Sequence, residues 1–359
     1  MPLRTIVFVF FLGISSVFAQ EASLRLVFAG DLMGHDSQIK AAKQDAGGKG
    51  YDYKPVYKHL KDYFSGADLA VINLEHTLAG EPYTGYPQFS SPDESVFAIK
   101  DAGFDLVATV NNHSLDRGKR GLERTISVLD SMGLKHFGIY RDTAERDRNY
   151  PLFVEKNGIK LAFLSYTYGT NGLVESAPNV VNRIDTAVIA ADIIKAKQGS
   201  PDFTIVFIHW GIEYEIAENK EQRKLAEFMA LNGVDLIIGG HPHVVQPFDK
   251  IFVPGRDSVP VIYSLGNFIS NMKKRYTDGG VAFEAVLQKN DGKTKITDYG
   301  YVPFYVYKPN GVFRMLPRCK KNEPPCNEYK MKPDERAAME LFFKDTEKIL
   351  RKLPEKSIK

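Results

Sequence analysis

The chain has 359 residues, enough for one large α/β domain or two modest ones. Hydrophobic residues make up 43% and charged residues 25% of the chain, which is ordinary for a globular protein and excludes a fibrous or disordered one. The formal net charge of +3 is too small to indicate nucleic acid or an anionic membrane surface as a partner.

The first residues have the pattern of an export signal. Arg4 precedes an apolar stretch at 6–17, which is too short to span a bilayer with polar flanks. Residues 17–19 (VFA) before Gln20 fit a cleavage site of the small-residue type, so we predict a secretory signal peptide over 1–19. An uncleaved anchor is the weaker alternative, and no cysteine stands beside the site for lipid attachment. The mature protein is therefore expected to be exported, to the periplasm in a Gram-negative cell.

Apolar segments and helical segments then alternate along the chain. Strands are predicted at 23–29, 68–73, 105–110, 160–165, 203–208, 235–238 and 259–264. Helices are predicted at 54–64, 92–102, 121–132, 185–197 and 219–231. Such alternation predicts parallel strands, right-handed crossovers and helices on both faces.

The pattern changes after residue 280. Segments 281–287 and 295–307 read as antiparallel strands, and 334–352 as a charged amphipathic helix. We therefore expect one domain over 20–290, followed by a C-terminal β extension and helix over 291–359. Cys319 and Cys326 predict a small disulfide loop in an exported chain; two unpaired thiols are the alternative, and a zinc pair is less favoured because no histidine follows.

The stretch 235–246 (DLIIGGHPHVVQ) carries the most informative histidines. An apolar strand ends at two glycines, whose backbone is free to turn sharply, and His241 and His243 follow. Ligands bind beyond the carboxyl ends of strands in open α/β sheets, and imidazole suits a divalent metal. The alternative for these residues alone is a loop with two surface histidines.

Five more polar clusters stand at the ends of apolar strands. The six together are Asp31 with His35, Glu75 with His76, Asn112 and His113 with Asp116, His209 with Glu213, His241 with His243, and Asn267. One such cluster is usually structural, as a helix cap or a hydrogen-bonded loop residue. Six at the same kind of position indicate a common rim, and their carboxylate, amide and imidazole groups can hold two divalent ions.

With these motifs the sequence resembles the CapA family of capsule (poly-gamma-glutamate) biosynthesis proteins, a branch of the calcineurin-like metallophosphatase fold. The resemblance spans roughly residues 24–268 and rests on segments 28–33 (FAGDLM), 73–75 (NLE), 111–118 (NNHSLDRG), 166–172 (YTYGTNG), 209–214 (HWGIEY), 239–246 (GGHPHVVQ) and 264–268 (SLGNF). It implies a layered α/β/β/α sandwich.

The resemblance also implies roles for individual residues. It places Asp31 and His243 on a first metal ion and Glu75 as a bridge, with Asn112, His209 and His241 on the second ion. His113 would be a general acid beside the leaving group. One or two divalent ions (Mn, Fe, Zn or Mg) are the implied cofactor, and the histidine rings and the Glu75 carboxylate should converge within about 5 Å.

The sequence departs from the phosphatase pattern at two positions. Met33 stands where phosphatases carry a histidine, and His35 is a candidate replacement with two more residues of reach. Glu75 stands at the place of the bridging aspartate and is one methylene longer. These departures put the spacing of the ions, and catalysis itself, in question.

Residues beside the clusters are candidates for binding substrate. Arg117 can position an anionic substrate with Asp116, although a turn that opens the next helix, with Asp116 as its cap, is equally favoured. The segment 83–92 is rich in glycine, proline and aromatic residues and predicts a loop over the site. Tyr168 is a polar residue that can line the same cleft.

Two functions follow from this reading. The first is an exported, metal-dependent hydrolase or transferase of the cell envelope that acts on a phosphoester or on an amide-linked anionic polymer. The second is a non-catalytic component that holds such a polymer during synthesis or export, together with membrane-bound synthesis machinery.

Overall fold

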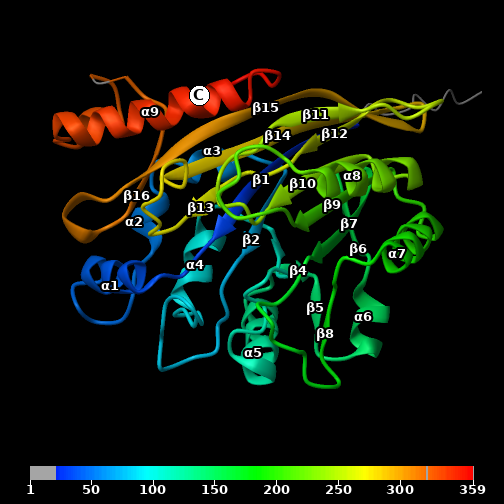
Figure 1. Cartoon of the computed structure of the whole chain (residues 1–359), viewed down its shortest axis with the longest axis horizontal. Helices are drawn as coiled ribbons and strands as arrows, with labels where there is room; N and C mark the ends of the chain where they lie inside the picture. Colours follow the sequence, from blue (N-terminus) through cyan, green and yellow to red (C-terminus); the bar gives the residue numbers. More distant parts are fainter. Residues whose placement is uncertain (1–21, 321, 359) are drawn as a thin grey trace, which may run out of the picture.

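The structure, a computed structural model, describes residues 22–320 and 322–358. The predicted signal peptide over 1–19 lies outside these residues. Two large sheets dominate the fold, and Figure 1 shows helices α7 and α8 beside one of them and α9 along the other. Within the described ranges, no helix is long and apolar enough to cross a bilayer.

The first sheet has eight strands. In spatial order they are β16 (Arg314–Pro317), β15 (Lys293–Tyr307), β14 (Gly279–Asn290), β1 (Ala22–Leu32), β2 (Leu69–Leu74), β3 (Leu106–Ala108) and β4 (Lys135–Phe137), with β13 (Asn267–Ile269) paired to β1. Strands β1 to β4 are parallel, whereas β14, β15 and β16 are antiparallel. The predicted boundary at residue 290 falls in the turn between β14 and β15, which belong to one sheet.

The second sheet has six strands. In spatial order they are β11 (Phe248–Ile251), β12 (Val259–Ile262), β10 (Leu236–Gly240), β9 (Phe203–His209), β7 (Ile159–Thr167) and β6 (Leu152–Lys156). Its four inner strands are parallel, and the two edge strands are antiparallel to their neighbours. A separate two-stranded ribbon joins β5 (Ile139–Tyr140) to β8 (Val180–Val181).

The helices vary from one turn to nearly five. They are α1 (Asp36–Asp45), α2 (Lys54–Tyr57), α3 (Lys61–Ser65), α4 (Glu94–Asp101), α5 (Gly118–Ser131), α6 (Thr143–Asn149), α7 (Thr186–Gln198), α8 (Lys220–Asn232) and α9 (Pro333–Ile349), with 3₁₀ turns at Pro309–Gly311 and Cys326–Glu328. The single helix predicted at 54–64 is wrong, because the chain turns at 58–60 and forms two short helices instead.

Alternating side chains on the strands build three cores and therefore four layers. On β9, Phe203 and Phe207 face the first sheet, while Val206 and Ile208 face α7 and α8. The first sheet alternates in the same way, with one face against the second sheet and the other against α2 to α4. Period-two alternation with both faces apolar is what a buried sheet between two layers requires. The predicted α/β/β/α sandwich is confirmed.

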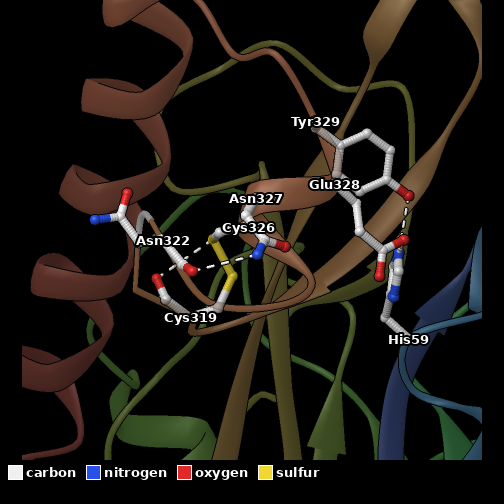
Figure 2. Close-up of a disulfide and its surroundings, with 7 residues drawn as sticks. All are labelled: His59, Cys319, Asn322, Cys326, Asn327, Glu328 and Tyr329. Atoms are coloured by element: carbon white, nitrogen blue, oxygen red, sulfur yellow. Dashed lines mark hydrogen bonds and ion pairs between the residues drawn. A yellow bond between two sulfur atoms is a disulfide. The ribbon is translucent and has the colours of Figure 1, made fainter.

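The C-terminal residues are attached to the first sheet at several points. Helix α9 packs Phe342 and Phe343 against Tyr305 of β15. Cys319 and Cys326 form a disulfide, the first of the three alternatives for this pair, and Figure 2 shows it beside Tyr329. The Tyr329 hydroxyl lies 2.8 Å from Nε2 of His59, so the segment that follows the disulfide loop contacts the turn between α2 and α3.

Candidate metal centre

Polar side chains from both sheets meet at the carboxyl ends of the parallel strands. Asp31 belongs to the end of β1, His209 is the last residue of β9, and Glu75 directly follows β2. His241 and His243 follow β10, which pairs with β9. All five side chains are buried, at 3% exposed or less. The packing of the two sheets therefore brings the ends of four parallel strands together into one cluster.

The cluster divides into two groups that share one residue. Glu75, His209 and His241 form the first group, and Asp31, Glu75 and His243 form the second. Within each group the possible ligand atoms lie within 4.8 Å of one another. This division follows the one implied by the family resemblance, with Glu75 common to both groups. Occupancy by metal stays a prediction.

Gly239 and Gly240 were expected to allow a sharp backbone turn, but in the structure they are needed because a side chain would not fit. A Cβ on Gly239 would lie 2.0 Å from the carbonyl oxygen of Tyr263, and one on Gly240 would lie 2.7 Å from Oδ1 of Asp31. Both are therefore required for close approach. The left-handed backbone falls instead on the histidines, with φ of 98° at His241 and 58° at His243. Such conformations are unfavourable for residues with a side chain and concentrate at functional sites.

Hydrogen bonds fix Asp31 between the two sheets. Its Oδ1 accepts from Nδ2 of Asn73 at 2.8 Å, and its Oδ2 accepts from the backbone N–H of His241 at 3.1 Å. Burial would raise the pKa of Asp31, but hydrogen bonding to His243 and the charge of His209 lower it to about 2. Asp31 is therefore an ionised carboxylate at any physiological pH.

His243 is held between two carboxylates. Its Nδ1 lies 3.4 Å from Oδ2 of Asp31, and its Nε2 lies 3.8 Å from Oε1 of Glu75. Nδ1 also lies 3.0 Å from Oδ1 of Asn267. Burial alone would lower the pKa of His243, but the charges of Glu75 and Asp31 outweigh burial and raise it to about 9. The two carboxylates therefore favour positive charge at this imidazole, and a bound cation would also supply it.

His209 donates a hydrogen bond from Nε2 to the amide oxygen of Asn112 in the second part of the cluster. Nε2 of His209 lies 2.7 Å from Oδ1 of Asn112 and 3.4 Å from Oε1 of Glu75. The Asn112 amide donates to Oδ1 of Asn171 at 3.2 Å, which fixes the amide oxygen toward the histidine. An ion between these atoms would take the place of that proton.

Atoms without partners test whether the cluster fits a divalent ion. Both carboxylate oxygens of Glu75 are fully buried and have no hydrogen-bond partner among the described residues, and the same holds for Nδ1 of His241. Burial holds the pKa of His241 well below its usual value, so the imidazole is neutral and keeps a free lone pair. Burial of a carboxylate without a hydrogen bond lowers the stability of the folded protein by roughly several kcal/mol unless a cation balances its charge. The donor set therefore fits one or two divalent ions.

His113 lies beside the cluster, at the end of β3. Its Nδ1 is 2.8 Å from Oδ2 of Asp116, and its ring packs at 4.6 Å from that of Phe89. Oδ2 of Asp116 also accepts from the backbone N–H of Phe89 at 2.8 Å. Asp116 thus orients the imidazole instead of capping α5, whose N-cap is Arg117.

Two predicted residues do not join the cluster. His35 precedes α1; its ring packs on Phe89, and its Nδ1 accepts from the backbone N–H of Asn271 at 3.2 Å. It belongs to neither metal group, because those contacts hold it outside the carboxylate pair. Arg117 donates to the hydroxyl of Thr84, within the loop predicted over the site, instead of projecting into the cluster.

Two residues that contact the cluster were not assigned to it from the sequence. Asn73 contacts both Asp31 and Nδ1 of His209, the latter at 3.3 Å. Its signal was a polar residue at the end of an otherwise apolar strand. Tyr168, considered only as a polar residue of the cleft, places its ring 4.4 Å from that of His241 and is 47% exposed. Its ring therefore contacts His241 on one side and solvent on the other.

Comparisons with known proteins agree with this architecture. A family model described as "Bacterial capsule synthesis protein PGA_cap" matches residues 25–272. The chain belongs to this family. The match includes every residue of the two metal groups, and it confirms the resemblance to CapA proteins.

Relatives within this family include two proteins of Bacillus. The chain is 29% identical over 261 residues to a capsule biosynthesis protein CapA of Bacillus anthracis. The aligned region covers 70% of this chain and 60% of that protein. It is 27% identical over 283 residues to the PGA biosynthesis protein CapA of Bacillus subtilis, and this aligned region covers 75% of this chain and 70% of that protein. The match therefore spans less than two thirds of the first relative.

A solved structure supports the fold. The NAD nucleotidase of Haemophilus influenzae superposes with a TM-score of 0.51 over 92% of this chain and 68% of that protein. The two sequences are 13% identical, so the similarity concerns the fold alone.

Proposed function

We propose that this protein is an exported, divalent-metal-dependent hydrolase that cleaves phosphoester or amide bonds in an anionic cell-envelope polymer of the poly-gamma-glutamate type. The observation that carries the proposal is Glu75. Its two carboxylate oxygens are buried without a partner among the described residues, between three histidines and Asp31. A cation shared by the two groups would balance this carboxylate.

The chemistry of such a site follows from its donor set. When bound, divalent ions activate water and neutralise charge that develops on the attacked group. Asp31 and Glu75 are the negative ligands that would hold them, and the histidines supply neutral nitrogen. His113 would hold or release a proton at Nε2, because Asp116 occupies its Nδ1.

The choice of polymer rests on the family. The Bacillus subtilis relative is described as a biosynthesis protein for PGA, and an exported protein of this family would meet the polymer in the cell envelope. We extend that biology to this chain as part of the proposal, including an association with membrane-bound synthesis machinery.

A second candidate is a component that binds the polymer without cleaving it. The observation in its favour is that no histidine stands at the position where phosphatases carry one. Met33 occupies it, is buried, and its backbone bonds to Ile269, while His35 is engaged elsewhere. One nitrogen ligand fewer would leave an ion that holds carboxylates but activates water poorly.

One experiment separates the two candidates. The mature chain is purified, its metal content is measured, and hydrolysis of an aryl phosphodiester and of gamma-glutamyl amides is assayed with added Mn²⁺. His241→Ala should abolish hydrolysis and lower metal content with the fold intact. His136→Ala, which removes a histidine paired with Asp130 away from the cluster, serves as the matched control. Metal binding without any hydrolysis would favour the second candidate, and absence of metal binding would contradict both.

A further inference from the structure

A lysine and a tyrosine stand together beside the candidate metal centre. The ammonium of Lys274 lies 4.0 Å from the ring centroid of Tyr214, which is the geometry of a cation–π contact. The Tyr214 ring in turn lies 6.4 Å from the ring of His243, between centroids. Two successive side-chain contacts therefore connect an ammonium group to one of the proposed ligands.

The backbone holds Tyr214 in this place. Its N–H donates to the carbonyl oxygen of Pro242 at 2.8 Å, and Pro242 separates His241 from His243. The φ of Tyr214 is 70°, a left-handed conformation that is unfavourable for a tyrosine. Since left-handed residues with a side chain concentrate at functional sites, the ring beside His243 is a candidate for positioning other groups.

The segment that carries Lys274 is fixed on several sides. The backbone N–H of Asn271 donates to Nδ1 of His35 at 3.2 Å, and the guanidinium of Arg275 donates to Asp345 at 2.9 Å. Two backbone carbonyls of the segment also accept hydrogen bonds, that of Met272 from Nζ of Lys308 at 3.0 Å and that of Thr277 from Nδ2 of Asn267 at 3.1 Å. Asn267 also contacts His243. The lysine therefore projects from a segment that is tied to the site itself.

The positive charge of Lys274 is available to a ligand. Of the nearby cations, Arg275 and Lys308 are engaged in the contacts above, whereas Lys274 is exposed, as is its neighbour Lys273. No ion pair involves Lys274 within residues 22–320 and 322–358. The residue also lies beyond the family match, which ends at residue 272, so the family model does not account for it.

We propose that Lys274, positioned by Tyr214, binds a negatively charged group of the substrate next to the bond that lies at the metal centre. The group is an oxyanion, either a carboxylate of an amide-linked polymer or a phosphate of a phosphoester. The inference rests on the proposed function for the reaction, but binding can be measured without turnover.

The test uses the mature chain with Mn²⁺ at low salt and two ligands of equal charge, an oligo-gamma-glutamate and an oligophosphate. Lys274→Ala should weaken binding of the preferred ligand about fivefold, and Lys274→Glu by more than about tenfold. Lys274→Arg should restore most of the affinity. A loss confined to one ligand identifies the group as carboxylate or phosphate.

The chain offers a matched control. Lys250 lies 4.9 Å over the ring of Tyr299 in the same kind of contact, but it pairs with Pro260 near the start of β12, at the end of the sheet opposite the histidines. Lys250→Ala should leave affinity unchanged. If its effect equals that of Lys274→Ala, general electrostatic attraction explains the loss and the proposal is overturned.

The role of Tyr214 is tested by a double-mutant cycle. Tyr214→Leu should weaken binding of the anionic ligand, and its effect should not add to that of Lys274→Ala, because the ring acts through the ammonium. Equal affinity of Lys274→Ala and wild type, with unchanged metal content, overturns this inference alone. A wild-type protein that neither binds nor hydrolyses any of the ligands overturns the proposed function with it.

Discussion

Replacement of Glu75 by glutamine gives a prediction that depends on both metal groups at once. The substitution keeps the shape of the side chain and removes a charge whose two oxygens have no partner among the described residues. In the metal-free protein this carboxylate is compensated only by histidines, with the nearest nitrogen, Nε2 of His209, at 3.4 Å. Loss of the charge relieves a buried carboxylate that has no hydrogen bond, but it also removes the charge that raises the pKa of His243. The two effects oppose each other, so the stability of the metal-free protein should change little.

The metal-loaded protein should respond much more strongly. An ion at one hundred times its Kd stabilises a folded protein by about 2.7 kcal/mol, which corresponds to roughly 5 °C in Tm for a domain of this size. Because Glu75 belongs to both groups, Glu75→Gln should remove most of this shift. Thermal unfolding with and without Mn²⁺ measures it, and a full metal-induced shift in the variant would refute the reasoning.

Glu284 provides the matched control. It is also a buried carboxylate, but it pairs with Arg25 at 2.6 Å and Lys356 at 3.0 Å. Glu284→Gln breaks a satisfied network, so it should lower the Tm of the metal-free and metal-loaded protein alike and preserve the difference between them. If the two variants behave the same way, Glu75 is a structural carboxylate.

Three further predictions concern the same site. Because the pKa of His243 is raised to about 9, its proton stabilises the metal-free protein below pH 6.5, and this contribution is lost toward pH 9. A metal ion must displace that proton, so metal affinity, measured by titration calorimetry, should rise up to about tenfold per pH unit between these values. Asp116→Asn removes the charge that orients the neighbouring imidazole, so hydrolysis should fall about 100-fold while metal content stays unchanged, and an unaltered rate would contradict that role. Gly240→Ala should weaken metal binding at least tenfold, roughly, because its Cβ would lie 2.7 Å from an oxygen of Asp31, whereas Gly169→Ala, at a position with open space, should not.

Much of the fold could be predicted because the strands are written plainly in the sequence. Segments such as 203–208 are continuously apolar, and both of their faces prove to be buried. The order of strands within each sheet could not be predicted in the same way. β14 pairs with β1 across more than 250 residues of chain, and such pairing depends on long-range packing that no local pattern encodes.

The candidate site was predictable where each residue follows an apolar strand. Asp31, Glu75 and the histidines at 209, 241 and 243 all stand at that position, and parallel sheets bring such positions together. His35 followed the same logic and does not join the groups, because the first residues of α1 turn away toward Asn271. Asn73 was overlooked because a side chain in a buried strand gives no sign of which neighbour it will contact.

The placement of Tyr214 and Lys274 lay beyond sequence reasoning for another reason. Sixty positions separate them in the chain, and their contact depends on the left-handed backbone of Tyr214 and on the anchors of the segment 270–277. Neither feature has a local signature, because a tyrosine rarely adopts this conformation unless its surroundings impose it.

The metal centre itself is tested most directly by anomalous diffraction. Crystals of the protein, equilibrated with Mn²⁺ and measured at the manganese absorption edge, should show anomalous density in contact with the Glu75 carboxylate. Two peaks are expected, one among Glu75, His209 and His241 and the other among Asp31, Glu75 and His243. An intact cluster with no anomalous density beside Glu75 at saturating Mn²⁺ would contradict a metal centre at this position.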